Sequence, residues 1–196
     1  MQADLAALVG SRICHDLISP IGAISNGVEI LSLTNNASRE EIALIKQSVE
    51  SATARIRFFR IAYGAGSATQ PVPTSEITSI LLALGAHGRI TYHWGIQSDQ
   101  MRDTVRCIFL ALQAIETALP LGGNIDVVEN DSRVKLTATG RRITFDAGTW
   151  AGLDGSAKPE PVSSADVQCA LLGLSLASTG RNLTVDAQDD HLTIRF

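Results

Sequence analysis

The sequence predicts an α+β fold in two parts: a helical hairpin that forms a four-helix bundle on dimerisation, followed by an α/β-sandwich domain. Three observations support this prediction. Apolar residues in the first third of the chain recur every three or four positions, as in helices that pack along their whole length. A stretch rich in glycine, serine and proline follows, GAGSATQPVP. Beyond it, helical segments are interleaved with short segments in which apolar and polar residues alternate, as they do in half-buried strands.

The first helix is expected from Gln2 to Leu33. His15 and Asp16 lie off its apolar seam and face solvent, because 100° per residue places them on the flanks of that seam. The seam consists of Cys14, Leu17, Ile21, Ile24, Val28 and Leu31.

The second helix follows a short polar connector. Ser38 and Glu41 form a capping box at its start, and Gly64 and Gly66 end it. Two helices joined by a short loop form an antiparallel hairpin. The hairpin cannot bury its seams alone, so we predict a homodimer. The seam of the second helix consists of Ile42, Ile45, Val49, Ala52, Ile56, Phe59 and Tyr63.

The predicted domain boundaries are 1–66 for the hairpin, 67–73 for a linker and 74–196 for the second domain. Residues 146–162 contain few apolar side chains and two prolines, and we expect a loop there. The expected elements of the second domain are helices over 74–86, 101–119 and 165–177, and strands over 89–94, 125–129, 134–139, 143–145, 183–187 and 191–196.

Composition narrows the possible functions. The chain has 196 residues, a net charge of −4 and no basic block, which argues against non-specific nucleic-acid binding. Its three isolated cysteines fit reduced core thiols in the cytoplasm better than disulfides or a metal site. No apolar run reaches transmembrane length and no secretory signal is recognisable, so we expect a cytoplasmic protein without a membrane anchor.

The string that begins at His15, HDLISPIGAISNGVEIL, closely resembles the H-box of histidine kinases. A histidine beside an aspartate is weak evidence alone, since most surface histidines are only solvated. The longer string, however, is similar to that of the ChpT-type histidine phosphotransferases of alphaproteobacterial phosphorelays. This resemblance implies that His15 accepts a phosphoryl group and that Asp16 orients the ring or accepts its other N–H.

The second domain resembles a degenerate histidine kinase ATP-binding domain. Gln113 stands where kinases use an asparagine to hold magnesium, and LTATGRRI replaces the Asp-x-Gly-x-Gly loop without its aspartate. Without that aspartate, the adenine amino group of ATP has no acceptor, and without the asparagine the charge of the triphosphate is poorly neutralised. We therefore expect no cofactor and no metal bound by this chain, with Mg²⁺ supplied by the partner receiver domain.

The resemblance implies a histidine phosphotransferase of a multistep phosphorelay, which moves a phosphoryl group between aspartates of receiver domains. The donor would be the receiver of a hybrid histidine kinase, and the acceptors would be response regulators of the cell cycle. Two alternatives stay open at this point. One is a histidine kinase with a divergent ATP site, and the other is a non-catalytic dimer that binds a receiver.

Four arginines are candidates for partner binding. If the hairpin turns near Asn36, His15 lies opposite about residue 57, where Arg55, Arg57 and Arg60 cluster, and Arg12 lies one turn before His15. Guanidinium groups there would steer an acidic receiver or stabilise the phosphoryl group. A solvated helix face explains the same residues equally well.

The resemblance adds further positions on the first helix. Ser19 matches a position that affects phosphatase activity in kinases, although a serine beside Pro20 equally well fills space. Ile18, Gly22 and Asn26 are assigned to the partner-facing surface. Packing within the dimer explains the small residues as readily.

Overall fold

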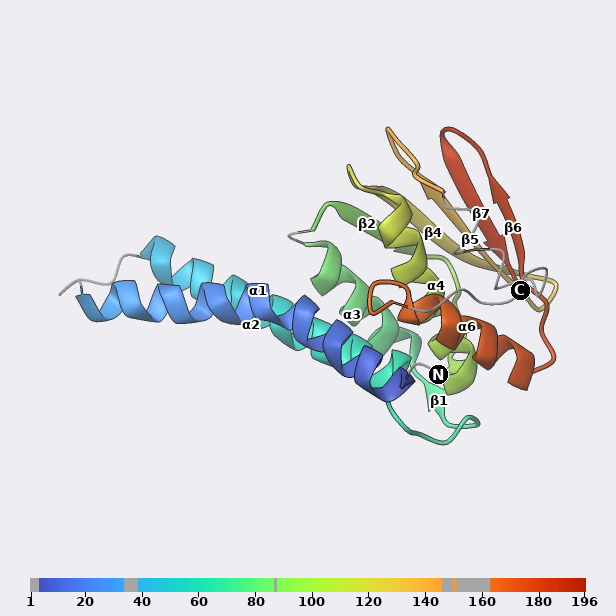
Figure 1. Cartoon of the computed structure of the whole chain (residues 1–196), viewed down its shortest axis with the longest axis horizontal. Helices are drawn as coiled ribbons and strands as arrows, with labels where there is room; N and C mark the ends of the chain where they lie inside the picture. The colour runs from blue at the N-terminus through green and yellow to red at the C-terminus, as the bar shows by residue number, and fades with distance from the viewer. Residues whose placement is uncertain (1–3, 34–38, 87, 146–149, 151–162) are drawn as a thin grey trace.

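We describe the chain from a computed structural model that covers residues 4–33, 39–86, 88–145, 150 and 163–196. Its first two helices, α1 (Leu5–Leu33) and α2 (Arg39–Ala62), run antiparallel and form the predicted hairpin. One end of the hairpin packs against the rest of the molecule, and the other end projects well away from it (Figure 1). The predicted connector between the helices lies outside the described residues.

The predicted apolar seam of α1 divides into two rows. Leu17, Ile24 and Leu31 are half-buried, whereas Cys14, Ile21 and Val28 are exposed. The division follows from the hairpin geometry, because α2 covers only one side of α1. The expectation that every cysteine is a core thiol is therefore wrong for Cys14, while Cys107 and Cys169 are buried.

The second domain is built on a five-stranded sheet with the order β2-β4-β5-β7-β6. β2 runs parallel to β4, and the other neighbours are antiparallel. Asp131 and Ser132 link β4 to β5 with positive φ angles of 50° and 61°, as the two central residues of a type I′ hairpin turn require. The strands are β2 (Ile90–Trp94), β4 (Gly123–Asn130), β5 (Arg133–Thr139), β6 (Thr184–Ala187) and β7 (His191–Arg195).

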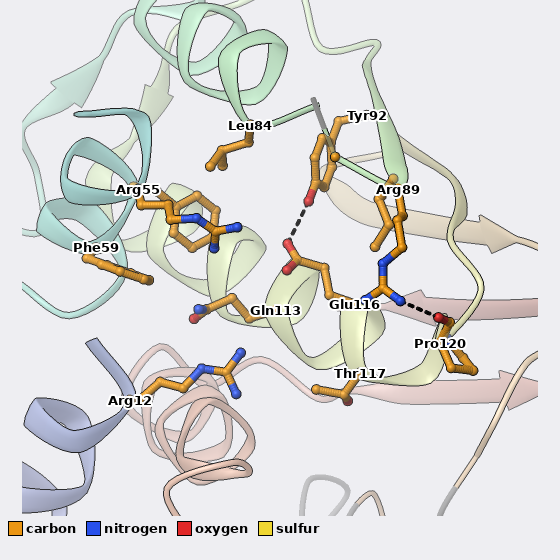
Figure 2. A pocket seen from close by; sticks show the side chains of 13 residues that line it. Arg12, Arg55, Phe59, Leu84, Arg89, Tyr92, Gln113, Glu116, Thr117 and Pro120 are labelled. Carbon is orange, nitrogen blue, oxygen red and sulfur yellow. Dashed lines mark hydrogen bonds between the residues drawn. The ribbon is translucent and has the colours of Figure 1, made fainter. Parts of the chain in front are cut away.

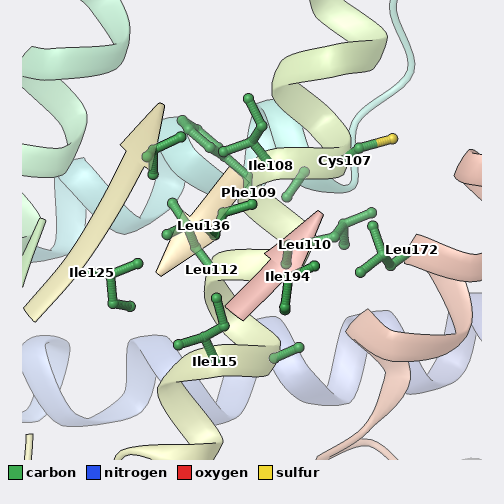
Figure 3. Close-up of a cluster of buried hydrophobic side chains, with 14 of the residues drawn as sticks. Cys107, Ile108, Phe109, Leu110, Leu112, Ile115, Ile125, Leu136, Leu172 and Ile194 are labelled. Atoms are coloured by element: carbon green, nitrogen blue, oxygen red, sulfur yellow. The ribbon is translucent and has the colours of Figure 1, made fainter. Parts of the chain in front are cut away.

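Three helices complete the domain: α3 (Thr74–Gly85), α4 (Arg102–Ala118) and α6 (Val167–Ser178). They lie on the hairpin side of the sheet, which makes α4 the centre of the core (Figure 1). Side chains of α4 meet Ile125, Leu136 and Ile194 from the sheet and Leu172 from α6 (Figure 3). The α+β sandwich is confirmed.

The C-terminal half of α2 belongs to this same core. The rings of Phe58 and Phe109 stack with centroids 4.3 Å apart and an interplanar angle of 1°. Phe59, Ile61 and Ala62 are also buried there. The hairpin is therefore anchored in the second domain by apolar packing, in addition to the chain connection.

Two parts of the second domain differ from the prediction. Residues 143–145 do not form a strand, and the Thr144 N–H instead donates to the Ala118 carbonyl over 2.9 Å. The structure also has a small antiparallel sheet of β1 (Pro71–Val72) and β3 (Gln100–Met101). β1 lies in the predicted linker, and strands of two residues are too short to give a periodic signal.

The predicted loop over 146–162 lies outside the described residues, except for Trp150. Its side chain is buried, and its ring stacks on Phe145 with centroids 5.7 Å apart. In the part of the chain that the structure describes, no helix combines the length and the apolar character needed to cross a bilayer.

The packing of Phe58 on Phe109 yields a stability prediction. Phe58→Ala should lower the free energy of unfolding by about 3–5 kcal/mol, because it leaves a cavity where the hairpin joins the core. Urea denaturation followed by circular dichroism measures this loss. Leu82→Ala, at a side chain that is 70% exposed on α3, is the control and should change stability by less than about 0.5 kcal/mol. Equal losses in both variants would contradict the anchoring role.

Candidate functional site

His15 and Asp16 lie side by side on α1, near the end of the hairpin that is anchored in the second domain. The His15 side chain is 82% exposed and that of Asp16 only 11%. The Nδ1 atom of His15 lies 3.0 Å from Oδ1 of Asp16. The imidazole therefore projects into solvent while its inner nitrogen is held by a carboxylate.

This contact fixes the tautomer of His15. A carboxylate oxygen only accepts hydrogen bonds, so Nδ1 of the imidazole must carry the proton. In the neutral ring, the lone pair then resides on Nε2, the nitrogen directed away from Asp16. The outward nitrogen is thus the nucleophilic one.

Arg12 holds the other oxygen of Asp16. Its Nε donates to Asp16 Oδ2 over 3.0 Å, and its Nη1 donates to the carbonyl of Ala165, just before α6, over 3.1 Å. The Arg12 side chain is only 14% exposed. The side chain is largely turned inward, because the carboxylate one helical turn away attracts it. A partner-binding role for Arg12 stays a prediction.

The other predicted residues of α1 share a face with His15. Ile18, Ser19, Gly22 and Asn26 lie three, four, seven and eleven positions after it, which places all of them on one stripe of the helix. Ile18, Ser19 and Asn26 are exposed, and no atom lies within 4 Å of where a Cβ on Gly22 would stand. A broad, accessible surface therefore adjoins the imidazole.

The three arginines of α2 do not form the cluster that we predicted. Arg57 donates through Nη1 to Ser79 Oγ over 3.3 Å, and Arg60 donates through Nη2 to Glu76 Oε1 over 3.2 Å. Both bonds lead to α3, whereas Arg55 lines a cavity together with Arg12. They diverge because neighbouring positions on a helix point in different directions. A partner-binding role for Arg57 and Arg60 stays a prediction.

Gln113, which takes the place of the kinase asparagine, is buried in α4. Its Oε1 accepts a hydrogen bond from the Tyr63 hydroxyl over 2.6 Å. Burial raises the pKa of Tyr63 to about 12, which keeps that hydroxyl a donor. The Oε1 atom of Gln113 is thus engaged in a hydrogen bond within the protein.

Glu116 and Tyr92 form a second, half-buried polar pair beside Gln113. The Tyr92 hydroxyl donates to Glu116 Oε1 over 2.7 Å. Burial raises the pKa of the Glu116 carboxyl, and the bond from Tyr92 and the nearby Arg55 act against this shift. Among the described residues, no group of three histidine, cysteine, aspartate or glutamate side chains is arranged to hold a metal.

The chain thus places an exposed histidine beside a largely buried carboxylate, on a helical hairpin that is joined to an α/β sandwich. Residues 74–191 match the family model of the histidine phosphotransferase C-terminal domain. The chain belongs to this family.

Individual relatives agree with that assignment. The chain is 33% identical over 190 residues to the protein phosphotransferase ChpT of Brucella abortus (strain 2308), covering 94% of this chain and 90% of the relative. The 1.7 Å structure of a bacterial phosphotransferase overlays on the whole chain with a TM-score of 0.81 at 30% identity and covers 97% of that protein. Family membership favours phosphotransfer over the two alternatives, an ATP-driven histidine kinase and a non-catalytic receiver-binding dimer.

The inner contacts of the site were missed by the sequence analysis. The pair of Arg12 and Asp16 has a signal, since arginine and aspartate at i and i+4 commonly pair on a helix. The contact of Arg12 with Ala165 has none, because the two residues are 153 positions apart.

The hydrogen bond between His15 and Asp16 yields a second prediction. Asp16→Asn keeps the size of the side chain but removes the charge, so Nδ1 loses its charged acceptor and the tautomer is no longer fixed. We expect the rate of phosphoryl transfer through His15 to fall by roughly 10- to 100-fold, as for other residues that orient a reactive ring. A time course of transfer from a labelled receiver, with samples quenched at set times, measures this rate. A rate within twofold of the parent protein would contradict the orienting role.

Proposed function

We propose that His15 is the phosphoacceptor of a phosphorelay intermediate that takes a phosphoryl group from one receiver aspartate and passes it to another. The observation that carries this proposal is the imidazole itself: it is 82% exposed, and its Nδ1 is held by Asp16. An in-line reaction needs free approach to the nucleophile, and Nε2 is the open nitrogen. Asp16 is the positioning residue of this proposal.

The proposed reaction forms a bond between Nε2 of His15 and the phosphorus of an aspartyl phosphate. The bond from phosphorus to the aspartate oxygen breaks, and the aspartate leaves as a carboxylate. Because Nδ1 keeps its proton, the phosphorylated ring carries a positive charge, which the Asp16 carboxylate offsets. The same steps in reverse pass the phosphoryl group to the second receiver.

The proposed source of the phosphoryl group is a protein rather than ATP, and Mg²⁺ would enter with the receiver. This is supported by the missing aspartate of the nucleotide loop and by Gln113, whose Oε1 is bonded to Tyr63. The proposed partners are the receiver of a hybrid kinase as donor and response regulators, including those of the cell cycle, as acceptors. We place these reactions in the cytoplasm, in keeping with the free thiols.

We also propose that the active species is a homodimer. Exposed apolar side chains repeat every seven residues on both helices, at Ile21 and Val28 on α1 and at Ile42, Val49 and Ile56 on α2. A single hairpin leaves these rows in water, and a second copy would cover them in a four-helix bundle. The heptad spacing fits this occupant, because it is the repeat of packed helices.

The central test is transfer of label. A receiver phosphorylated on aspartate should pass its phosphoryl group to this chain, and a second receiver should then remove it. His15→Ala should abolish labelling, because it removes the only histidine of α1. His93→Ala, on the exposed phase of β2, is the control and should label normally. Labelling of His15→Ala, or labelling of the parent protein by ATP alone, would overturn the proposal.

The dimer makes a separate prediction. Ile56→Asp places a charge in the exposed row of α2, where the side chain is 54% exposed, and should convert the dimer to a monomer. Light scattering coupled to size-exclusion chromatography measures the mass. Leu174→Asp, at a comparably exposed leucine on α6, controls for added charge and should leave the mass unchanged. A monomeric parent protein would refute the dimer.

A further inference from the structure

A cavity of about 540 Å³ lies between the hairpin and the second domain. Arg12 and Arg55 line it from the hairpin, and Gln113 and Glu116 of α4 face them (Figure 2). The chemistry proposed at His15 does not use this space. Its volume falls in the range of sites for small molecules.

Arg55 has a buried polar atom without a partner, which indicates that this cavity binds a ligand. The side chain is half-buried on α2, yet it makes no hydrogen bond or ion pair with any residue that the structure describes. Its Nε is withdrawn from water without an acceptor. The Nε atom has therefore lost hydration without gaining an acceptor, although the nearby Glu116 carboxyl acts on the charge of the guanidinium group. A bound anion would supply the missing acceptor.

The charges around the cavity favour an anion. Arg12 and Arg89 add two further guanidinium groups, and Arg89 donates through Nη1 to the Pro120 carbonyl over 2.6 Å. The opposing group in the lining is the Glu116 carboxyl, which already accepts a bond from Tyr92. The lining therefore carries three guanidinium groups and one carboxyl, and Arg12 is also paired with Asp16 just outside it.

The lining also includes apolar side chains. Phe59, Leu84 and Ile90 contribute side chains, and the ring of Tyr92 lies above Glu116 (Figure 2). A cavity of this size also exceeds what a bare inorganic anion fills. The ligand should therefore carry an organic group as well as a charge.

We propose that this cavity binds a small phosphate monoester. Its phosphate would lie between Arg55 and Arg12, and its organic group would lie against Leu84 and Ile90. A phosphate suits the site better than a carboxylate does. The two arginines approach from different helices, and a tetrahedral dianion offers separate oxygens to both, whereas a planar carboxylate pairs best with one guanidinium.

Arg12 connects this site to His15. Its guanidinium lines the cavity and also holds Asp16, the residue that orients the imidazole. A phosphate bound to Arg12 competes with Asp16 for the same positive group, and so alters how firmly the ring is held. This coupling rests on the proposed function, whereas binding in the cavity does not.

Isothermal titration of the full chain with phenyl phosphate tests the binding. We expect one site per chain, with weaker binding of inorganic phosphate and of benzoate. Arg55→Gln should weaken phenyl phosphate binding about tenfold or more, as expected for a lost charge-assisted bond. Arg133→Gln, at an exposed arginine of β5, should bind as the parent protein does. No binding at millimolar phenyl phosphate, or equal binding by Arg55→Gln, would overturn the proposal.

A second variant guards against misfolding. Leu84→Phe narrows the apolar side of the cavity without changing its charge, and it should also weaken binding. Both variants should keep the circular dichroism spectrum of the parent protein. If a correctly folded Leu84→Phe variant binds phenyl phosphate unchanged, the ligand does not occupy this cavity.

The coupling is measured as the rate of transfer to His15 with and without phenyl phosphate. Adding phenyl phosphate should change the transfer rate of the parent protein and should not change that of Arg55→Gln. In the binding measurement, His15→Ala should bind phenyl phosphate as the parent protein does. Loss of transfer in every sample would refute the proposed function and leave the binding site standing. Transfer without any binding would refute the cavity site alone.

Discussion

The burial of the middle of α4, where every residue from 107 to 115 is buried, is the constraint on which the rest of the structure depends. The middle of this helix has the sheet on one side and α6 and the hairpin on others, so eight of its nine residues there are apolar, Gln113 being the exception. Phe109 reaches α2 while Ile108 and Leu112 belong to the same central cluster. Because one helix packs against both parts, the hairpin holds a defined position relative to the second domain. The surroundings of His15 are set by that position.

Much of this fold could be predicted from the sequence, because its long elements carry a strong periodic signal. The two helices of the hairpin, the three later helices and the five strands of the main sheet all appear where the periodicity places them. The failures have local causes. β1 and β3 are two residues long, and residues 143–145 have a strand-like composition but are held by one bond to the end of α4. Cys14 was expected to be buried because it belongs to the apolar seam of the first helix. The periodicity of one helix does not show how many neighbouring helices cover its apolar face.

The candidate site was predictable only in part. His15 and Asp16 are adjacent in the chain, so their contact follows from a local pattern that a sequence displays directly. The directions of Arg55, Arg57 and Arg60 depend on what packs beside α2, and α3 draws two of them away. The cavity could not have been foreseen. Its lining comes from α1, α2, α3, β2 and α4, and their juxtaposition is a property of the tertiary structure.

The bond from Arg12 to Ala165 has a consequence for how the protein matures. It joins the helix that carries His15 to a residue 153 positions later, so the support beneath Asp16 is complete only after the chain as far as Ala165 has been synthesised. A contact of such long range forms late and loses chain entropy in forming. A truncated or nascent chain would display the His15 imidazole without its full anchorage. The full support of a site in the first helix thus depends on a residue far along the chain, although His15 and Asp16 are adjacent.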